Sequence, residues 1–231
     1  MLAGVSVTWY TWLEQGRRIN ASIDVLEALA RALLLDDAAR GHLLALATPV
    51  PSAAVELIEQ APDALVRLIT SMEPAPAYVL GPRWEFLAWN RAQSRLYPTI
   101  DRLADADRNL LWVIFAEPTA RDLLADWAVQ APRILAEFRA GTASLRTDPG
   151  VVSLVERLRV TSTEFAEWWA QADVAHFQTR LRTYSHPRAG SLVFEYQQLT
   201  ASEWPSLRVV CQLPVPGDDS AARLAAWRDM A

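Results

Sequence analysis

The sequence predicts an α+β protein, in which a small all-helical unit is followed by a larger domain built on an antiparallel sheet. Two short apolar runs precede a long helical stretch, and three strand-like runs follow it. Alternation is clearest at Leu192, Phe194 and Tyr196, as is typical of a strand that buries one face. We therefore expect one five-stranded sheet with helices packed on one face.

The first 47 residues carry the pattern of three short helices. The stretch VSVTWYTWLEQGR at 5–17 has Ser6 where a helix is capped and Gly16 where one ends. Ser22 can cap a second helix, and Asp36 or Asp37 can begin a third. Two prolines in TPVPS then favour an extended connector. We expect the units to be a helical domain at 1–47, a linker at 48–56, a larger domain at 57–217 and a tail at 218–231.

Within the larger domain the elements are expected in a definite order. A helix spans about 54–72, and AYVLGPRWEFLAWN then indicates a hairpin around Gly81-Pro82-Arg83. A mostly helical middle runs from about 90 to 172; Pro132 should kink or interrupt it, and Thr161 with Glu164 has the spacing of a capping box. Three strands are expected after it, at 176–184, 191–199 and 207–213, and the tail is weakly helical.

Composition narrows the class of protein. At 231 residues and 52% hydrophobic content the chain can build a real core, and its net charge of −5 gives no global attraction to nucleic acid. All 22 basic residues are arginine. Cys211 is the single cysteine, so no disulfide forms within one chain, and a reducing cytoplasm is the expected location. No window has the length of a membrane span and no signal peptide is recognisable.

Catalysis is not expected. The three histidines, His42, His176 and His186, are far apart and show no metal-ligand spacing, and no nucleophile elbow or phosphate-binding loop occurs. Cys211 lies in the apolar run RVVCQL, where a buried inert thiol is the expected state. We expect no metal and no cofactor, apart from an apolar ligand of the kind discussed below.

The stretch at 5–17 resembles the recognition helix and following turn of xenobiotic-response-element-type helix-turn-helix regulators. The resemblance implies that this helix enters the major groove, with double-stranded DNA as the partner. The residues implied to face DNA are Ser6, Thr8, Trp9, Tyr10 and Arg17. Alternatively, Trp9 and Trp12 are core or interface residues of the helical unit.

Two features of the sequence argue against strong DNA binding by these residues. The resembling family places two further helices before the position at which Met1 stands. Residues 1–47 also carry four Arg against five Asp or Glu, which is poor for phosphate binding. We expect the 231 residues alone to bind DNA weakly or not at all, and exposed Trp9 and Trp12 would then be free to contact a second chain.

Five segments between about 75 and 199 resemble the ligand-binding domain of MmyB-like transcription regulators. They are PAYVLGPRWEFLAWNRA, RNLLWVIF, ARDLLADWA, TSTEFAEWWAQADV and HPRAGSLVFEY. The resemblance implies a PAS-like sensory domain with a cavity between sheet and helices, associated with fatty-acid-type ligands. Eight of the ten Trp lie beyond the linker and are candidates either for pocket walls or for ordinary core.

We expect an apolar tunnel with one polar end. The predicted apolar lining is Tyr78, Trp84, Trp89, Leu111, Phe115, Trp127, Phe165, Trp168, Trp169 and Phe194. For the carboxylate the candidates are Arg108, Asn90 and His186, since an Arg fork matches a carboxylate best. The alternatives are a surface salt bridge for Arg108 with Asp105, Asp107 or Glu117, a helix N-cap for Asn90, and turn formation for His186.

The sequence as a whole predicts a ligand-responsive transcription regulator that acts as a homodimer. Binding of a fatty acid or similar apolar molecule would shift the arrangement of two DNA-binding units. The alternative is a lipid-binding or protein-interaction module that has lost DNA recognition.

Overall fold

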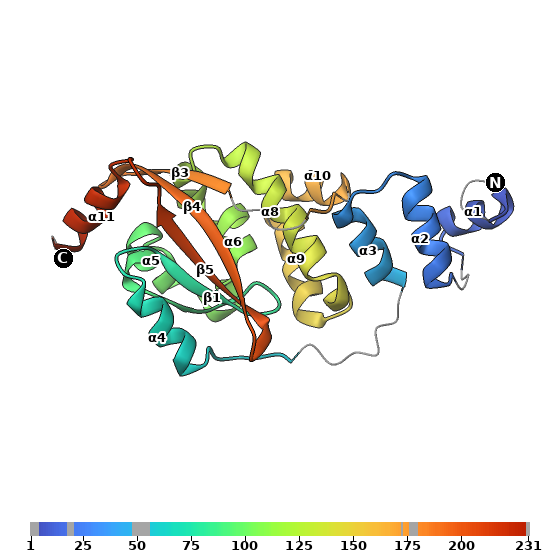
Figure 1. Cartoon of the computed structure of the whole chain (residues 1–231). Helices are drawn as coiled ribbons and strands as arrows, with labels where there is room; N and C mark the ends of the chain where they lie inside the picture. The colour runs from blue at the N-terminus through green and yellow to red at the C-terminus, as the bar shows by residue number, and fades with distance from the viewer. Residues whose placement is uncertain (1–4, 18–20, 48–55, 172, 176–179, 230–231) are drawn as a thin grey trace.

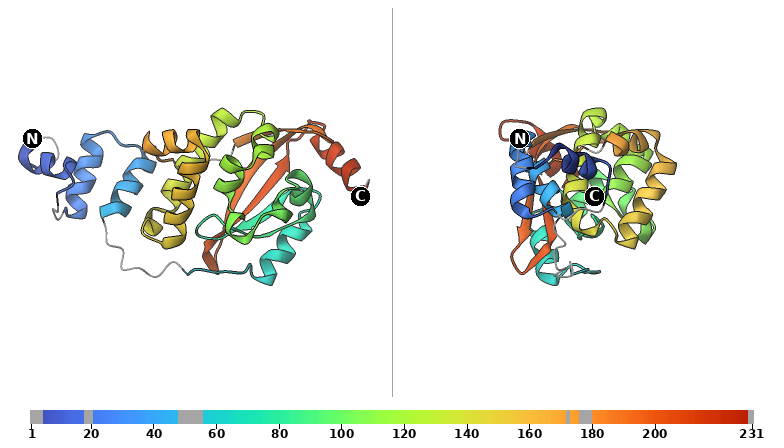
Figure 2. Two further views of the ribbon diagram at one scale, coloured as in Figure 1. Left: turned by 180° about the vertical axis from the view of Figure 1, so that it is seen from behind. Right: turned by 90° about the vertical axis from the view of Figure 1, so that its right-hand side faces the viewer.

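The structure, a computed structural model, describes residues 5–17, 21–47, 56–171, 173–175 and 180–229. Figures 1 and 2 show three N-terminal helices at one end of an elongated molecule and the C-terminal helix at the other, with a sheet and its helical cover between them. In the described part of the chain no helix is long and apolar enough to span a bilayer.

The three N-terminal helices form where the sequence predicts them. They are α1 (Val7–Glu14), α2 (Ile23–Ala32) and α3 (Asp37–Ala47). Ser6 caps α1, because its Oγ accepts the Trp9 amide hydrogen at 3.1 Å. Gly16 ends the helix with φ of +68°, a conformation that side chains with a Cβ disfavour.

Few side chains hold this unit together. Leu26, Leu29 and Ala30 of α2 are its buried apolar residues among those described. Arg40 on α3 adds a two-pronged ion pair to Glu27 on α2, with both N–O distances at 2.8 Å. So small a core gives the unit little stability of its own.

The five expected strands form one antiparallel sheet, as predicted. In chain order they are β1 (Ala77–Leu80), β2 (Phe86–Trp89), β3 (Arg180–His186), β4 (Gly190–Ala201) and β5 (Trp204–Pro214), and in the sheet they lie in the order β2-β1-β5-β4-β3. Tyr78 faces Trp89 across the β1–β2 hairpin, and Arg182 faces Phe194 across the β3–β4 hairpin. Residues 176–179, expected to begin the third strand, lie outside the described residues.

Helices fill the long middle of the chain. They are α4 (Asp63–Ser71), α5 (Arg91–Leu96), α6 (Leu110–Ala116), α7 (Pro118–Leu123), α8 (Trp127–Gly141), α9 (Pro149–Thr161) and α10 (Thr163–Gln171), followed after the sheet by α11 (Ser220–Asp229). Three single turns of 3-10 helix join them: η1 (Ile100–Arg102), η2 (Asp105–Asp107) and η3 (Ala143–Leu145).

Three local predictions differ from the structure. The helix expected over 54–72 begins only after Pro62, because a residue that precedes proline avoids the helical region. α8 runs through Pro132 without interruption; proline removes the hydrogen bond to the carbonyl of Ala128, but Ala128 is exposed and water can replace the donor. The cap of α10 is Ser162 rather than Thr161, since Ser162 Oγ accepts the Phe165 amide hydrogen at 3.1 Å.

The sheet has a core on each face. Tyr78 and Leu80 point into the main core beneath α5–α10, whereas Ala77 and Val79 point into a smaller core beneath α4. The expectation that helices cover one face therefore holds for α5–α10 but not for α4. The apolar run 77–80 is buried on both sides, which explains why it lacks alternation. Cys211 is buried beneath α4.

Candidate functional site

α1 presents a mixed surface. Thr8 and Arg17 are exposed, Trp9 and Tyr10 are half-buried, and Ser6 is exposed while it caps the helix. Trp12 is 41% exposed, with the Arg17 guanidinium 5.8 Å from its ring centre. The residues predicted to face DNA thus lie on α1 or beside its ends, and three of the five are exposed.

The predicted apolar ligand residues fall into two groups. One is an aromatic cluster among α6, α8 and α10, where the Phe115 ring lies 5.1 Å from Phe165 and 5.9 Å from Trp127. Trp168 and Trp169 complete this cluster, and Leu111 on α6 is buried in the same core. The other group lies toward the sheet and contains Tyr78, Trp84, Trp89 and Phe194, of which Trp89 is half-buried.

The three predicted polar candidates use most of their polar groups within the protein. Arg108 pairs with exposed Asp105 at 2.6 Å, while its buried Nε has no acceptor among the described residues. Asn90 caps α5 through Gln93 and donates its side-chain amide to the carbonyl groups of Ile69 and Ala75. His186 Nδ1 accepts the backbone amide hydrogens of the turn that follows it. These are the alternatives that the sequence left open for all three residues.

A different polar group stands in the interior between sheet and helices. Arg182 on β3 is 3% exposed, and its guanidinium carbon lies 3.5 Å from the ring centre of Tyr196 on β4. The Tyr196 hydroxyl shares a 2.6 Å hydrogen bond with the Tyr78 hydroxyl. Tyr97 and Tyr184 adjoin this space with their rings edge to face. The result is a buried guanidinium surrounded by phenol groups.

Charge is unevenly balanced around Arg182. The nearby carboxylate Glu137 on α8 forms an ion pair with Arg180, and burial raises the pKa of Glu137 despite this partner. Burial also raises the pKa of Tyr184 and Tyr196, so both phenols are uncharged at neutral pH. Arg182 hydrogen-bonds to the hydroxyl groups of Tyr184 and Tyr196, but it forms no ion pair with a carboxylate of the described residues. Among the described residues, Nε of Arg182 has no hydrogen-bond acceptor.

The space beside Arg182 is small and closed. It measures about 10 Å³, enough for about one water molecule, and its apolar wall is Phe86, Ile100, Leu110, Val113 and Ile114. A larger hollow of about 200 Å³ lies near Glu137, between Trp84 and Arg208. Within the described structure, Trp84 Nε1 and Arg208 Nη1 have no hydrogen-bond acceptor there. Both spaces are rich in hydrogen-bond donors.

The alternation of residues along β3 could have identified Arg182 as a buried residue, although arginine is usually exposed. Arg182, Tyr184 and His186 alternate along RLRTYSH in the same way as Leu192, Phe194 and Tyr196 alternate along the next strand. Pairing across the turn HPRAG sets Arg182 opposite Phe194, so both point into the same core. An arginine on the buried face of a strand is the feature to look for.

Comparison with known families identifies the larger domain. The sequence model of the MmyB-like transcription regulator ligand-binding domain matches residues 61–226, which is most of the chain. The chain belongs to the MmyB-like transcription regulators. A helix-turn-helix domain model matches residues 1–43 of this MmyB-like regulator. A search of curated proteins finds no match to the chain.

The residue ranges matched by the two family models coincide with the structural units of the MmyB-like regulator. The matched ligand-binding domain contains the whole sheet, its helical cover and the interior around Arg182. The matched helix-turn-helix domain contains α1 and α2 with most of α3. In the described part of the regulator, no cluster of three or more His, Cys, Asp or Glu side chains is arranged to hold a metal ion.

Proposed function

We propose that this regulator responds to a fatty acid or similar long-chain acid, which binds between the sheet and the helices with its carboxylate at Arg182. The observation that carries the proposal is the burial of Arg182, which is 3% exposed and forms no ion pair with a described residue, while the nearby Glu137 pairs with Arg180. A buried charge is costly unless it is paired. A ligand carboxylate would supply an ionic partner in a geometry that guanidinium favours.

The aliphatic chain of the acid would lie along the apolar wall of the interior. Each methylene that leaves water contributes about 0.8 kcal/mol. Because the space beside Arg182 measures about 10 Å³, the acid enters only if the helices that cover this face of the sheet move outward. α5, α6 and α7 are six or seven residues long, too short to be stable alone, so the cover is the part of the domain that yields most easily.

In this proposal, the outward movement of the short covering helices is the structural change that signals ligand binding. The acid would favour an open arrangement of these short helices over the closed one, and the difference in affinity sets how far the population shifts. We further propose that the ligand-binding domain is PAS-like and that the regulator acts as a homodimer, so that the shift alters the spacing of two helix-turn-helix units.

A gel-shift experiment separates this function from the alternative of a module without DNA recognition. The full-length regulator should shift a fragment of its own promoter region at low salt, and dodecanoate should change the shift. If it fails to shift the fragment, DNA recognition is absent and the interaction module is the better description. Arg17→Gln should weaken the shift, since Arg17 is exposed beside the helix that faces DNA.

Native mass spectrometry of the purified 231-residue chain, followed by denaturing extraction, tests the ligand class. The expected result is a co-purified acyl species or, after addition of dodecanoate, a one-to-one complex. A clean mass of the protein alone with no uptake of dodecanoate would overturn the proposal.

A further inference from the structure

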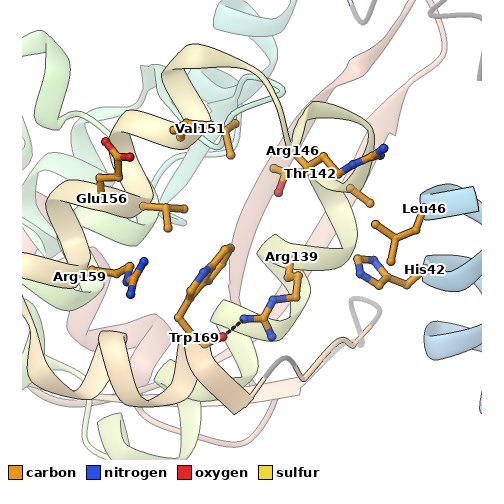
Figure 3. A pocket seen from close by; sticks show the side chains of 12 residues that line it. His42, Leu46, Arg139, Thr142, Arg146, Val151, Glu156, Arg159 and Trp169 are labelled. Carbon is orange, nitrogen blue, oxygen red and sulfur yellow. Dashed lines mark hydrogen bonds between the residues drawn. The ribbon is translucent and has the colours of Figure 1, made fainter. Parts of the chain in front are cut away.

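A second pocket lies where the helix-turn-helix meets the ligand-binding domain. It measures about 320 Å³ and is bordered by α3 on one side and by the end of α8, α9 and α10 on the other. Figure 3 shows His42 and Leu46 reaching in from α3 toward Arg139, Arg146, Arg159 and Trp169. We call it the junction pocket. Its volume falls in the range of about 300–1,000 Å³ that small-molecule sites occupy.

The walls of the junction pocket are largely apolar. Val151 and Val155 on α9 are buried at its base, and the half-buried indole of Trp169 forms one side. Leu46 on α3 is 43% exposed although it faces this apolar lining. A flat or short-chain apolar group would cover surface that is now in contact with water.

Positive charge exceeds negative charge around the pocket. Three arginines, Arg139, Arg146 and Arg159, line it together with one carboxylate, Glu156. Arg139 is held in place by the carbonyl oxygens of Asp173 at 2.7 Å and Trp169 at 2.5 Å, and it lies 4.4 Å from the centre of the Trp169 ring. None of the three arginines forms an ion pair within the described structure.

His42 adds an unsatisfied polar atom. Its Nδ1 is buried, and no described residue offers it a hydrogen-bond partner. Burial lowers the pKa of His42, and the charges of Arg139 and Arg146 lower it further, so the ring is neutral at neutral pH. A neutral imidazole can carry its proton on either nitrogen, and the tautomer protonated at Nδ1 would donate to an anion placed among the arginines.

We propose that the junction pocket binds a small amphipathic anion, a carboxylate or phosphate on an apolar body. Arg146, whose charge acts on His42, attracts the head group, and the valines and Trp169 hold the body. Because His42 and Leu46 belong to α3, such an anion binds best when the helix-turn-helix is docked on the ligand-binding domain. By linkage, the anion stabilises the docked arrangement and changes the affinity for DNA. This site is independent of the interior acid site at Arg182.

Titration of the full chain with 4-phenylbutyrate, and separately with phenyl phosphate, tests the proposal; 4-phenylbutanol is the uncharged control. Calorimetry should show saturable binding of at least one anion, and Arg146→Gln should weaken it by about tenfold, as expected for the loss of one charged hydrogen bond. Arg146 is exposed, so this variant should fold. Arg133→Gln, an exposed position on α8 outside the pocket, is the matched control and should leave binding unchanged.

Two further readouts locate the bound anion. Backbone amides of α3 should exchange hydrogen more slowly in the presence of the anion, and His42→Ala should reduce that protection. An Arg182→Met variant should bind 4-phenylbutyrate as the wild type does, which separates this site from the interior. Absence of saturable binding by both anions, or equal weakening by the Arg133→Gln control, would overturn the proposal.

Discussion

The guanidinium of Arg182 lies 3.5 Å from the ring centre of Tyr196, in the middle of the space enclosed by sheet and helices. The ring face attracts the cation, and nearby Glu137 adds a charge that is already shared with Arg180. Burial by itself lowers the pKa of Arg182, whereas the charge of Glu137, and that of the neighbouring tyrosines at the high pH where they ionise, raises it, and the net direction is upward. The interior therefore retains a permanent positive charge, which is the basis of the proposed preference for an acid.

The hydrogen bond between Tyr78 and Tyr196 joins β1 to β4 across β5, at 2.6 Å inside the core. Tyr78→Phe should lower the free energy of unfolding by about 1 kcal/mol, because the Tyr196 hydroxyl loses its partner. Tyr196→Phe should cost a similar amount, and the double variant should cost less than the sum of the two. Denaturant unfolding of the four proteins checks this; strict additivity would contradict a shared bond.

Asp148 ties the first hairpin to α9. Its carboxylate accepts two hydrogen bonds from Arg83, at 2.6 and 2.7 Å, and also caps α9 through the amides of Gly150 and Val151. Asp148→Ala should lower stability at neutral pH by about 1–2 kcal/mol. Asp126→Ala is the matched control, since Asp126 precedes α8 without making a side-chain cap. It should change stability little.

The same carboxylate predicts a pH dependence. Arg83, followed by the backbone amides, lowers the pKa of Asp148 below its ordinary value. A lowered pKa means that the stabilisation is present above the ordinary value of about 4 and is lost as pH falls through the folded value. Wild type and Asp148→Ala should therefore converge in stability in acid, which unfolding curves from pH 7 to pH 3 measure. A gap that stays constant with pH would contradict this role.

Gly16 ends α1 in a left-handed conformation, with φ of +68°. Gly16→Ala should loosen the last turn of α1 by about 1 kcal/mol, since a Cβ is disfavoured there. Gly41 is exposed inside α3, and Gly41→Ala should have the opposite effect, a gain of up to about 1 kcal/mol. Hydrogen exchange of the amides in α1 and α3 measures both. If exchange in α1 is unchanged by Gly16→Ala, the turn is not closed as described.

Much of this fold follows from local sequence patterns. Ser6 and Gly16 bound α1, and alternation at Leu192, Phe194 and Tyr196 defines β4, because capping and strand periodicity depend on neighbouring residues. The position of α4 does not follow, since the run 77–80 is apolar on both faces and does not reveal that a helix covers each. Packing on two sides appears only once the sheet is assembled.

Local sequence patterns also fail to predict which polar residues lie in the interior. Arg108, Asn90 and His186 stand beside apolar motifs, which makes them attractive from sequence, yet each uses polar atoms in contacts within the protein. Arg182 depends on pairing with β4 and on Glu137, 45 residues earlier by number, and these contacts arise only in the folded domain. Tertiary contacts therefore decide which arginine is buried.

The most direct measurement of the central claim is calorimetric titration of the full chain with dodecanoate and with dodecanol. Wild type should bind dodecanoate, and Arg182→Met should weaken that binding by about tenfold while binding of dodecanol is retained. Arg108→Gln, whose guanidinium already pairs with Asp105, should leave both titrations unchanged. Retained binding of dodecanoate by Arg182→Met, or failure of the wild type to bind it, would contradict an acid held by the buried guanidinium.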